Sequence, residues 1–474
     1  MDRKEITISN REDIINFVNS NPVSRKGFLI VLVALGGIFL DAYDFASLGI
    51  GADQIVAEFN LSPSGLGALT AVMAVGALLG ALFGGIFTDK LGRNKMFLID
   101  LVLLVVAAAG AALSPNMGTL IFFRFLLGVG VGLDVPVALS FIAEISNTKN
   151  KGRLVNLWQP MWYLAASFTG AVLLPFHFLG IEEHLWRYAV GFGAILALIV
   201  LFLRYKYMEE SPMWAAKNLP LLDAAKIVEK TYNVKVTILE SKEKVSKKDE
   251  RVALSTIFSK KYRGRTLLAS IITSTQSLEY FSVGFYIPVI SVMIFGKGII
   301  YAILGTLLFN FFGILGGLAQ SYLTGKVGIR KLALIGYVIV IIALITVGLT
   351  GNSAPTFLMT LLIAGFIFGH SFGPGSQGMT MATLSYPTEL RGIGSGWGQT
   401  MTRVGSIIGF FIFPILLASI GLSNTMLVIS AAPILGLLVV LLNKWDPTGK
   451  DLDNDNGSDF SIDQFKDQNI NIKI

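Results

Sequence analysis

Twelve apolar runs, each long enough to cross a lipid bilayer, constrain this chain more than any other feature of its sequence. A transmembrane helix needs about 20 consecutive apolar residues. Backbone polar groups within lipid must be satisfied inside the segment, so such runs predict helices. The runs fall near 27–51, 64–88, 96–114, 118–144, 154–176, 186–205, 266–295, 299–323, 331–350, 355–383, 391–419 and 422–443. We therefore expect an all-α membrane protein with twelve transmembrane helices.

The composition agrees with a membrane protein and excludes several functions. Hydrophobic residues make up 53% of the chain and charged residues only 15%. Cysteine is absent, which excludes disulfides, thiolate metal sites and a cysteine nucleophile. We find no nucleophile–base pair, no metal-ligand set and no phosphate-binding loop, so we expect no enzyme activity, no cofactor and no metal. The net charge of +7 is spread between the apolar runs, which argues against a nucleic-acid partner.

Lysine and arginine alternate between the connections. They crowd the connections after even-numbered runs and are scarce after odd-numbered ones. The positive-inside rule then predicts a multi-pass protein of the cell membrane with both termini in the cytoplasm. The expected domains are a cytoplasmic N-terminal segment (1–26), a six-helix bundle (27–205), a cytoplasmic linker with short helices (206–265), a second six-helix bundle (266–443) and a disordered cytoplasmic tail (444–474).

The two halves repeat one another weakly. Gly80, Lys90, Gly92 and Lys95 recur 236 residues later as Gly316, Lys326, Gly328 and Lys331. The first set follows the second run of its half, and the second set follows the corresponding run of the other half. Two pseudo-symmetric six-helix bundles with a site between them at the membrane midplane are a known plan of transporters.

Two carboxylates lie deep in the first run, at Asp41 and Asp44, on either side of Tyr43. At about 1.5 Å per residue they sit roughly 21 to 26 Å from the start of the run. Positions three apart share a helix face, so both side chains are expected to point the same way. An ionised carboxylate facing lipid is costly. We therefore interpret Asp41 and Asp44, together with Asp134 of the fourth run, as candidate proton carriers on a transport pathway; the alternative is neutralisation by structural partners.

The stretch 84–95, Gly-Gly-Ile-Phe-Thr-Asp-Lys-Leu-Gly-Arg-Asn-Lys, resembles the signature loop of the major facilitator superfamily. It stands between the second and third runs, where that family carries it. Its second copy has Gly325 in place of Asp89 and Ile329 in place of Arg93, which predicts an asymmetric gate. The resemblance implies alternating-access transport with gating residues Gly85, Asp89, Lys90, Gly92, Arg93, Arg124, Glu144, Arg153, Glu389 and Arg391.

Other motifs are similar to those of the same superfamily. They are the fourth-run stretch from Arg124 to Gly132, the sequence Glu-Ser-Pro-Met-Trp at 210–214, and the sequence Tyr-Pro-Thr-Glu-Leu-Arg-Gly at 386–392. Sugar porters, organic-ion carriers, aromatic-acid symporters and phosphate symporters share them. The resemblance covers residues 27–443 and implies the mode of action without naming a substrate.

Arg403 is the residue that bears most on the substrate. It lies about twelve residues, or roughly 18 Å, into the eleventh run, where a cation must pair internally or meet a substrate anion. The internal alternative is a structural pair with Glu279 or with an aspartate. Arg403 heads our candidate substrate-binding residues, which also include Tyr43, Gln159, Trp162, Tyr163, Gln276, Glu279, Tyr280, His370 and Gln399. His370 would also suit a proton relay.

The sequence thus predicts a secondary active transporter, proton-coupled, for a small organic anion such as an aromatic or other carboxylate. A proton-coupled sugar or phosphate transporter is the alternative, and a non-transporting nutrient receptor is a third. The expected partners are a small-molecule substrate, protons and the lipid bilayer, and we expect a monomer.

Overall fold

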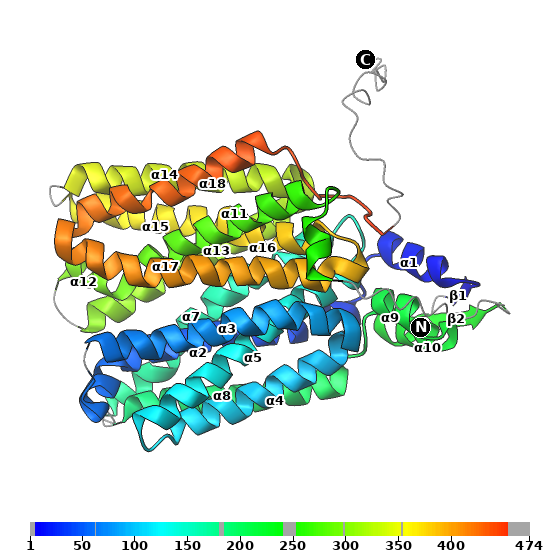
Figure 1. Ribbon diagram of the computed structural model, residues 1–474, viewed down its shortest axis with the longest axis horizontal. Helices are drawn as coiled ribbons and strands as arrows, with labels where there is room; N and C mark the ends of the chain where they lie inside the picture. The colour runs from blue at the N-terminus through cyan, green and yellow to red at the C-terminus, as the bar shows by residue number, and fades with distance from the viewer. Residues whose placement is uncertain are drawn as a thin grey trace, which may run out of the picture.

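The computed structural model describes residues 5–61, 63–179, 184–239, 253–296, 299–351 and 354–453. Its membrane helices lie side by side with their long axes roughly parallel (Figure 1). The N-terminal half contains α2 (Arg25–Phe59), α3 (Pro63–Leu91), α4 (Arg93–Ala112), α5 (Met117–Glu144), the short α6 (Lys151–Val155), α7 (Trp158–Phe178) and α8 (Leu185–Tyr207).

The C-terminal half has interrupted helices where the N-terminal half has continuous ones. It contains α11 (Arg263–Glu279), a π-helical turn η2 (Tyr280–Gly284), α12 (Ile287–Phe295), α13 (Ile299–Val327), α14 (Ile329–Thr350), α15 (Thr356–Phe372), α16 (Pro374–Leu384), α17 (Thr388–Ile429) and α18 (Ala431–Leu442). Gly421 has a φ of 74° and breaks α17, whose end joins α18 to form the last membrane helix. Among the described residues, counting each broken helix as one gives twelve membrane helices, which confirms the predicted fold class. Nine of these are long and apolar enough by themselves to cross a membrane, or ten if the bent pair α11–α12 counts as one span.

A small cap of helices and strands lies beyond one end of the membrane helices (Figure 1). It comprises β1 (Glu5–Ile8), α1 (Arg11–Ser20), α9 (Pro212–Asn218), α10 (Leu221–Tyr232) and β2 (Lys235–Ile238). The 3-10 helix η1 (Leu254–Phe258) packs instead at the end of the C-terminal half, where Ile257 lies in an apolar cluster with Tyr386 and Leu390. The two strands pair in parallel, with Glu5 opposite Lys235, and a small apolar core holds α1 against α9 and α10. The sequence predicted helices in the linker but not this strand pair.

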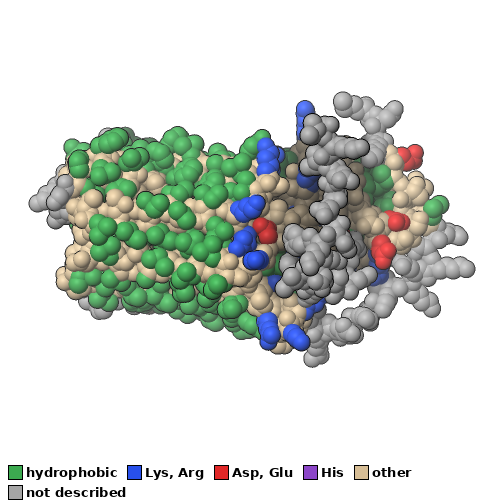
Figure 2. Space-filling model, turned by 90° about the horizontal axis from the view of Figure 1, so that it is seen from above, with side chains coloured by type: hydrophobic (Ala, Val, Ile, Leu, Met, Phe, Trp, Pro, Cys, Tyr) green, Lys and Arg blue, Asp and Glu red, His purple; other side chains and the backbone are tan. Residues whose placement is uncertain are grey.

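Side-chain chemistry divides the molecule along its length. Hydrophobic side chains cover the body of the bundle, and lysine and arginine gather where the body meets the cap (Figure 2). We call the end that carries the cap the charged end and the opposite end the far end. The apolar body matches the length of helix that a bilayer requires.

Glycines set the closest helix crossing of the N-terminal half, between α3 and α5. A Cβ on Gly80 would lie 2.2 Å from the carbonyl oxygen of Val129, and one on Gly132 would lie 2.1 Å from that of Ala77. Neither position can hold a side chain without moving the backbone. Small residues allow helices to pack closely in lipid. This crossing places α5, which carries the buried side chains of Arg124 and Glu144, next to α3.

Candidate functional site

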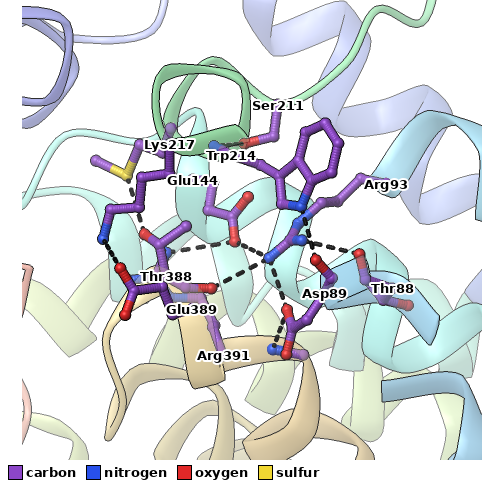
Figure 3. Close-up of polar contacts among 12 residues, drawn as sticks. Thr88, Asp89, Arg93, Glu144, Ser211, Trp214, Lys217, Thr388, Glu389 and Arg391 are labelled. Carbon is purple, nitrogen blue, oxygen red and sulfur yellow. Dashed lines mark hydrogen bonds and ion pairs between the residues drawn. The ribbon is translucent and has the colours of Figure 1, made fainter. Parts of the chain in front are cut away.

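Four charged side chains close the charged end, where the two halves meet (Figure 3). Arg93, at the start of α4, donates to Glu144 of α5 at 2.6 Å and to Asp89 of α3 at 3.0 Å. The same guanidinium reaches the carbonyl oxygen of Thr388 on α17 at 3.3 Å. Arg391 of α17 lies 3.5 Å from Glu144. We call Asp89, Arg93, Glu144 and Arg391 the charge cluster, and it links both halves.

Asp89 also joins the halves directly. Its two carboxylate oxygens accept hydrogen bonds from the backbone N–H groups of Gly392 and Ile393, at 3.2 and 3.0 Å. The indole of Trp214 donates to the Asp89 carbonyl at 2.9 Å, which ties the cap to the same point. Asp89 is therefore held from three directions, as a residue that closes a gate would be.

The Glu-Ser-Pro-Met-Trp sequence has a clear structural role. Glu210 accepts hydrogen bonds from the backbone N–H groups of Arg93 and Asn94 and so caps α4, while Ser211 caps α9. Gly92 has a φ of 94°, and a Cβ there would lie 2.3 Å from Glu210. Only glycine suits that position.

The second half repeats this cap with a residue from the tail. Gly328 has a φ of 95°, and Asp446 accepts from the backbone N–H of Arg330 at 3.1 Å. Glu210 and Asp446 are themselves 236 residues apart, as Gly92 and Gly328 are. The internal repeat therefore extends to the capping acids that follow each six-helix half.

The start of the tail is ordered, contrary to the disorder predicted for 444–474. Asp453 accepts from Arg391 at 3.2 Å, from Lys217 at 3.0 Å and from the Thr388 backbone N–H at 2.7 Å. Burial would raise the pKa of Asp453, but Arg391 and Lys217 outweigh it and hold the pKa well below its usual range. Residues 443–453 are thus fastened across the charged end, and residues 454–474 lie outside the described part of the chain.

A layer of uncharged polar side chains, which the sequence analysis missed, lies between the halves. Asn156 donates to Thr324 of α13 at 2.7 Å and to Gln377 of α16 at 3.1 Å. Gln320 donates to the Asn156 carbonyl at 3.0 Å and accepts from Gln377 at 2.8 Å. The available signal was two glutamines inside apolar runs, at 320 and 377. With the charge cluster, this layer keeps the charged end closed.

Asp41 of α2 and Arg403 of α17 lie in different halves and influence one another through charge, but among the described residues they form neither a hydrogen bond nor an ion pair. The Arg403 guanidinium lies 4.9 Å from the centre of the Phe45 ring, one helical turn from Asp41 on α2. Arg403 is 1% exposed, and Asp41 is the acid whose charge acts on it. Asp41 accepts no hydrogen bond within the described part of the chain. Of the internal partners that the sequence analysis considered for Arg403, Asp41 is the one whose charge acts on it.

Asp44 has different neighbours, contrary to the shared direction predicted for the two aspartates. Its charge acts on Arg124 of α5, and its Oδ1 lies 2.7 Å from where a Cβ of Gly193 on α8 would stand. Three residues along a helix leave side chains about 60° apart, enough to direct Asp41 to the other half and Asp44 into its own. No described group hydrogen-bonds the Arg124 guanidinium.

Asp134 lies in an ion cluster inside the N-terminal half, and the charges of this cluster also act on Asp41. Arg204 of α8 donates to Asp134 at 2.5 Å and lies 3.5 Å from Asp100 of α4. It also donates to the Ala34 carbonyl at 2.8 Å, and all three charged side chains are fully buried. The sequence analysis overlooked Arg204 because it ends an apolar run and reads as a loop cation.

Glu279 and His370 form a buried pair in the C-terminal half. His370 Nδ1 lies 3.1 Å from Glu279 Oε1, and the Tyr280 ring stacks on the imidazole at 4.8 Å. Tyr280 in turn accepts a hydrogen bond from the indole of Trp162, on α7 of the other half, at 3.2 Å. Glu279 therefore has His370 as its partner, and Asp41 is the acid whose charge acts on Arg403.

Of the other predicted binding residues, four are buried on α7, α11 and α17, and one packs within the N-terminal half. Tyr163 and Gln159 are buried on α7 beside the C-terminal half, with the Tyr163 ring against that of Tyr280. Gln276 and Gln399 are buried on α11 and α17, and Gln276 donates to the Thr273 carbonyl. Tyr43 instead donates to the Ala189 carbonyl within the N-terminal half at 2.9 Å, so it packs the bundle.

The remaining gating candidates lie outside the charge cluster. Lys90 is exposed, and Arg153 is exposed beside Tyr322. Glu389 is exposed and lies 3.5 Å from Lys217. The prediction for Gly85 falls on a residue of α3 whose surroundings are outside the described structure. The charge cluster and Gly92 are thus the part of the predicted gate that the structure brings together.

Two six-helix halves, with buried charged residues in their interior and the charge cluster joining them at one end, follow a known plan of membrane transporters. The chain matches the "Sugar (and other) transporter" family over residues 29–453. It belongs to that family, within the major facilitator superfamily that the sequence motifs indicated. The family match also confirms that the chain is a transporter and not an enzyme.

Individual relatives are similar along nearly the whole chain. The inner membrane metabolite transport protein YgcS of Escherichia coli is 26% identical over 435 residues, covering 91% of this chain and 94% of its own. The major myo-inositol transporter IolT of Bacillus subtilis is 27% identical over 439 residues, covering 87% and 89%.

Among solved structures, the proton:xylose symporter XylE bound to 6-bromo-6-deoxy-D-glucose has a TM-score of 0.75 at 20% identity, covering 90% of this chain and 98% of XylE. The inward-open conformation of XylE from E. coli has a TM-score of 0.66. These findings favour the sugar alternative over the predicted organic anion.

Proposed function

We propose that this transporter carries a small neutral polyhydroxylated solute, a sugar or a cyclic polyol, together with protons. The observation that carries the proposal is the balance of buried charge. In the described interior of the bundle, away from the charge cluster, the acids are Asp41, Asp44, Asp100, Asp134 and Glu279, and the bases are Arg124, Arg204 and Arg403. A site with surplus carboxylates repels an anion and invites protons.

Arg403 then acts as a structural and electrostatic partner of Asp41. A guanidinium buried in the membrane needs a counter-charge, and Asp41 supplies one from the other half. A substrate anion would have to compete with Asp41 for Arg403. This removes the main reason for the organic-anion prediction.

Neutral side chains between the halves suit a hydroxylated ring. Gln159, Gln276 and Gln399 carry amides that both donate and accept hydrogen bonds. Trp162 and Tyr280 place an aromatic contact where the two halves meet. Amides that recognise hydroxyl groups and aromatic rings that cover the apolar face of a sugar together define such a site.

Asp44 is the carboxylate that we assign to proton coupling. Asp44 and Arg124 are both buried, and the charge of each acts on the other. Protonation of Asp44 leaves Arg124 without that counter-charge, so the proton state changes the electrostatics between α2 and α5. Asp134 has Arg204 as a close partner, and we assign it a structural role.

A double-mutant cycle on Arg403 and Asp41 tests the substrate class. Arg403→Gln leaves Asp41 as an uncompensated buried acid, so we expect a lower melting temperature, and Asp41→Asn in the same chain should restore most of it. Residues in direct contact show coupling free energies of about 0.5–3 kcal/mol, and since these two charges act on one another without forming an ion pair, we expect a positive coupling at the low end of that range. The double variant should still bind myo-inositol or D-glucose, whichever the parent binds. Additivity of the two changes, with selective loss of carboxylate binding in Arg403→Gln, would restore the organic-anion proposal.

We also propose that the charged end faces the cytoplasm of a cell membrane and that the protein works as a monomer, because one chain supplies both halves and the gate. The ring of lysine and arginine at the charged end supports this orientation (Figure 2). A protease added to intact right-side-out cells should leave the 206–265 segment uncut, and the same protease should cut it in inverted vesicles. Cleavage in intact cells would reverse the orientation.

A further inference from the structure

Glu279 and His370 are two buried titratable side chains that the proposed mechanism does not use. They lie on α11 and α15 of the C-terminal half, with exposures of 0% and 2%. Asp44 and Arg124 lie in the other half, on α2 and α5. The Glu279–His370 pair is therefore a separate site in a different bundle, joined by the 3.1 Å contact between Nδ1 and Oε1.

The surroundings of the pair allow it to hold one proton without a net charge. The titratable groups that face Glu279 are the phenols of Tyr337 on α14 and Tyr163 on α7, and Tyr280 of η2 stacks on His370. Asp41, and not Glu279, is the acid whose charge acts on Arg403 of α17. With one shared proton the pair is neutral overall, and the proposal places that proton on the imidazole, with Glu279 as the carboxylate. Without that proton it carries a buried negative charge, which is costly in a bundle core.

The pair sits where two membrane helices are interrupted. Glu279 ends α11 directly before the π-helical turn, and the helix bends by 43° between this stretch and α12. His370 lies three residues before Gly373, where α15 ends and α16 begins. A Cβ on Gly375 would lie 2.5 Å from His370 Nε2, so the second ring nitrogen lies against this break. Discontinuous membrane helices typically form the substrate and ion sites of transporters.

The pair is also linked to the contact between the halves. The Tyr280 ring lies on the imidazole, and its hydroxyl accepts a hydrogen bond from Trp162 of the N-terminal half. Movement of the halves that breaks this hydrogen bond also moves the ring that covers His370. Water could then reach the pair.

We propose that Glu279 and His370 form a second proton-binding site, which holds one proton while Trp162 and Tyr280 are in contact and releases it to water when the broken helices move apart. In the release step the imidazolium N–H bond breaks, the proton passes to water, and an anionic Glu279 remains beside a neutral imidazole. The inference rests on the proposed transport cycle. It adds a proton in the C-terminal half to the one assigned to Asp44.

The test follows His370 by nitrogen NMR and needs no substrate. The chain has three histidines, so His177→Gln and His184→Gln leave His370 as the one labelled imidazole in protein held in lipid nanodiscs. Asp44→Asn is included so that the first proton site cannot titrate. We expect the His370 nitrogen shifts to move between protonated and neutral values from pH 5 to 9. A signal that stays fixed over that range would overturn the proposal.

Two further variants separate a shared proton from a structural contact. In Glu279→Gln, His370 should stay neutral across the range, because the carboxylate that holds its proton is gone. A titration unchanged by Glu279→Gln would show that His370 titrates alone and would also overturn the proposal. Tyr280→Phe keeps the ring on His370 and removes only the hydroxyl that meets Trp162, so it should shift the midpoint of the titration without abolishing it. Because transport is not measured, failure here is distinguishable from failure of coupling at Asp44.

Discussion

Asp44→Asn is expected to remove the part of proton-driven accumulation of substrate that depends on Asp44, while sparing exchange of substrate for substrate. With one proton per substrate, a gradient of one pH unit is worth about 1.4 kcal/mol, or roughly tenfold accumulation. The variant cannot bind or release that proton, so the part of the accumulation that depends on Asp44 should be lost. Exchange needs no net proton movement and should continue. The measurement is uptake into proteoliposomes with and without an imposed pH gradient.

Asp223→Asn is the matched control, because Asp223 lies in α10 of the cap and is about half exposed beside Lys226. It makes the same chemical change away from the bundle, and its accumulation should equal that of the parent. Full gradient-driven accumulation in Asp44→Asn would remove Asp44 from the coupling mechanism. Loss of exchange together with accumulation would indicate a folding defect, which a thermal melt of the same preparation would detect.

Arg93→Gln is expected to open the charged end and destabilise the protein. Arg93 is fully buried and contacts Glu144, Asp89 and the Thr388 carbonyl. Its removal leaves Asp89 with backbone N–H donors but no cation, and leaves Glu144 with Arg391 at 3.5 Å as its remaining cation. Breaking a buried ion pair by removing one partner costs about 3–5 kcal/mol. The chain has no cysteine, so a thiol introduced by Ser395→Cys on α17 reports opening through its rate of labelling. Labelling by a membrane-impermeant reagent should become faster, and the melting temperature should fall.

Lys95→Gln provides the control for that experiment. Lys95 lies two residues away on α4 and is exposed, and exposed substitutions of this kind change stability by less than about 0.5 kcal/mol. Its labelling rate should match that of the parent. An unchanged labelling rate and melting temperature in Arg93→Gln would mean that the charge cluster does not hold the gate.

Features that depend on a local pattern could be predicted from the sequence. Run length, the bias of lysine and arginine, and the Asp89–Arg93 motif each lie within a short stretch, and together they predicted twelve helices and the charge cluster. Residues whose role depends on a distant partner could not be placed. Asp453 meets Lys217, and Asn156 meets Gln377, across more than 200 residues.

The intramembrane charges show the same limit. The depth of Arg403 predicted that it needs a negative partner, but depth alone could not choose between a substrate and an acid of the chain. The structure supplies Asp41, and that choice changes the expected substrate from an anion to a neutral solute. Asp134 illustrates the converse, because its partner Arg204 stands at the end of a run, where an arginine is ordinarily a loop residue.

Proton-driven accumulation by the unmodified protein tests the central claim most directly. Proteoliposomes with an inward proton gradient would be offered labelled myo-inositol, D-glucose, D-xylose and nicotinate in turn, with and without a protonophore. The account predicts that at least one of the neutral polyhydroxylated solutes accumulates above its external concentration, that the protonophore abolishes this, and that nicotinate does not accumulate. Accumulation of nicotinate without any of the neutral solutes, or accumulation of a neutral solute that persists with the protonophore, would contradict it.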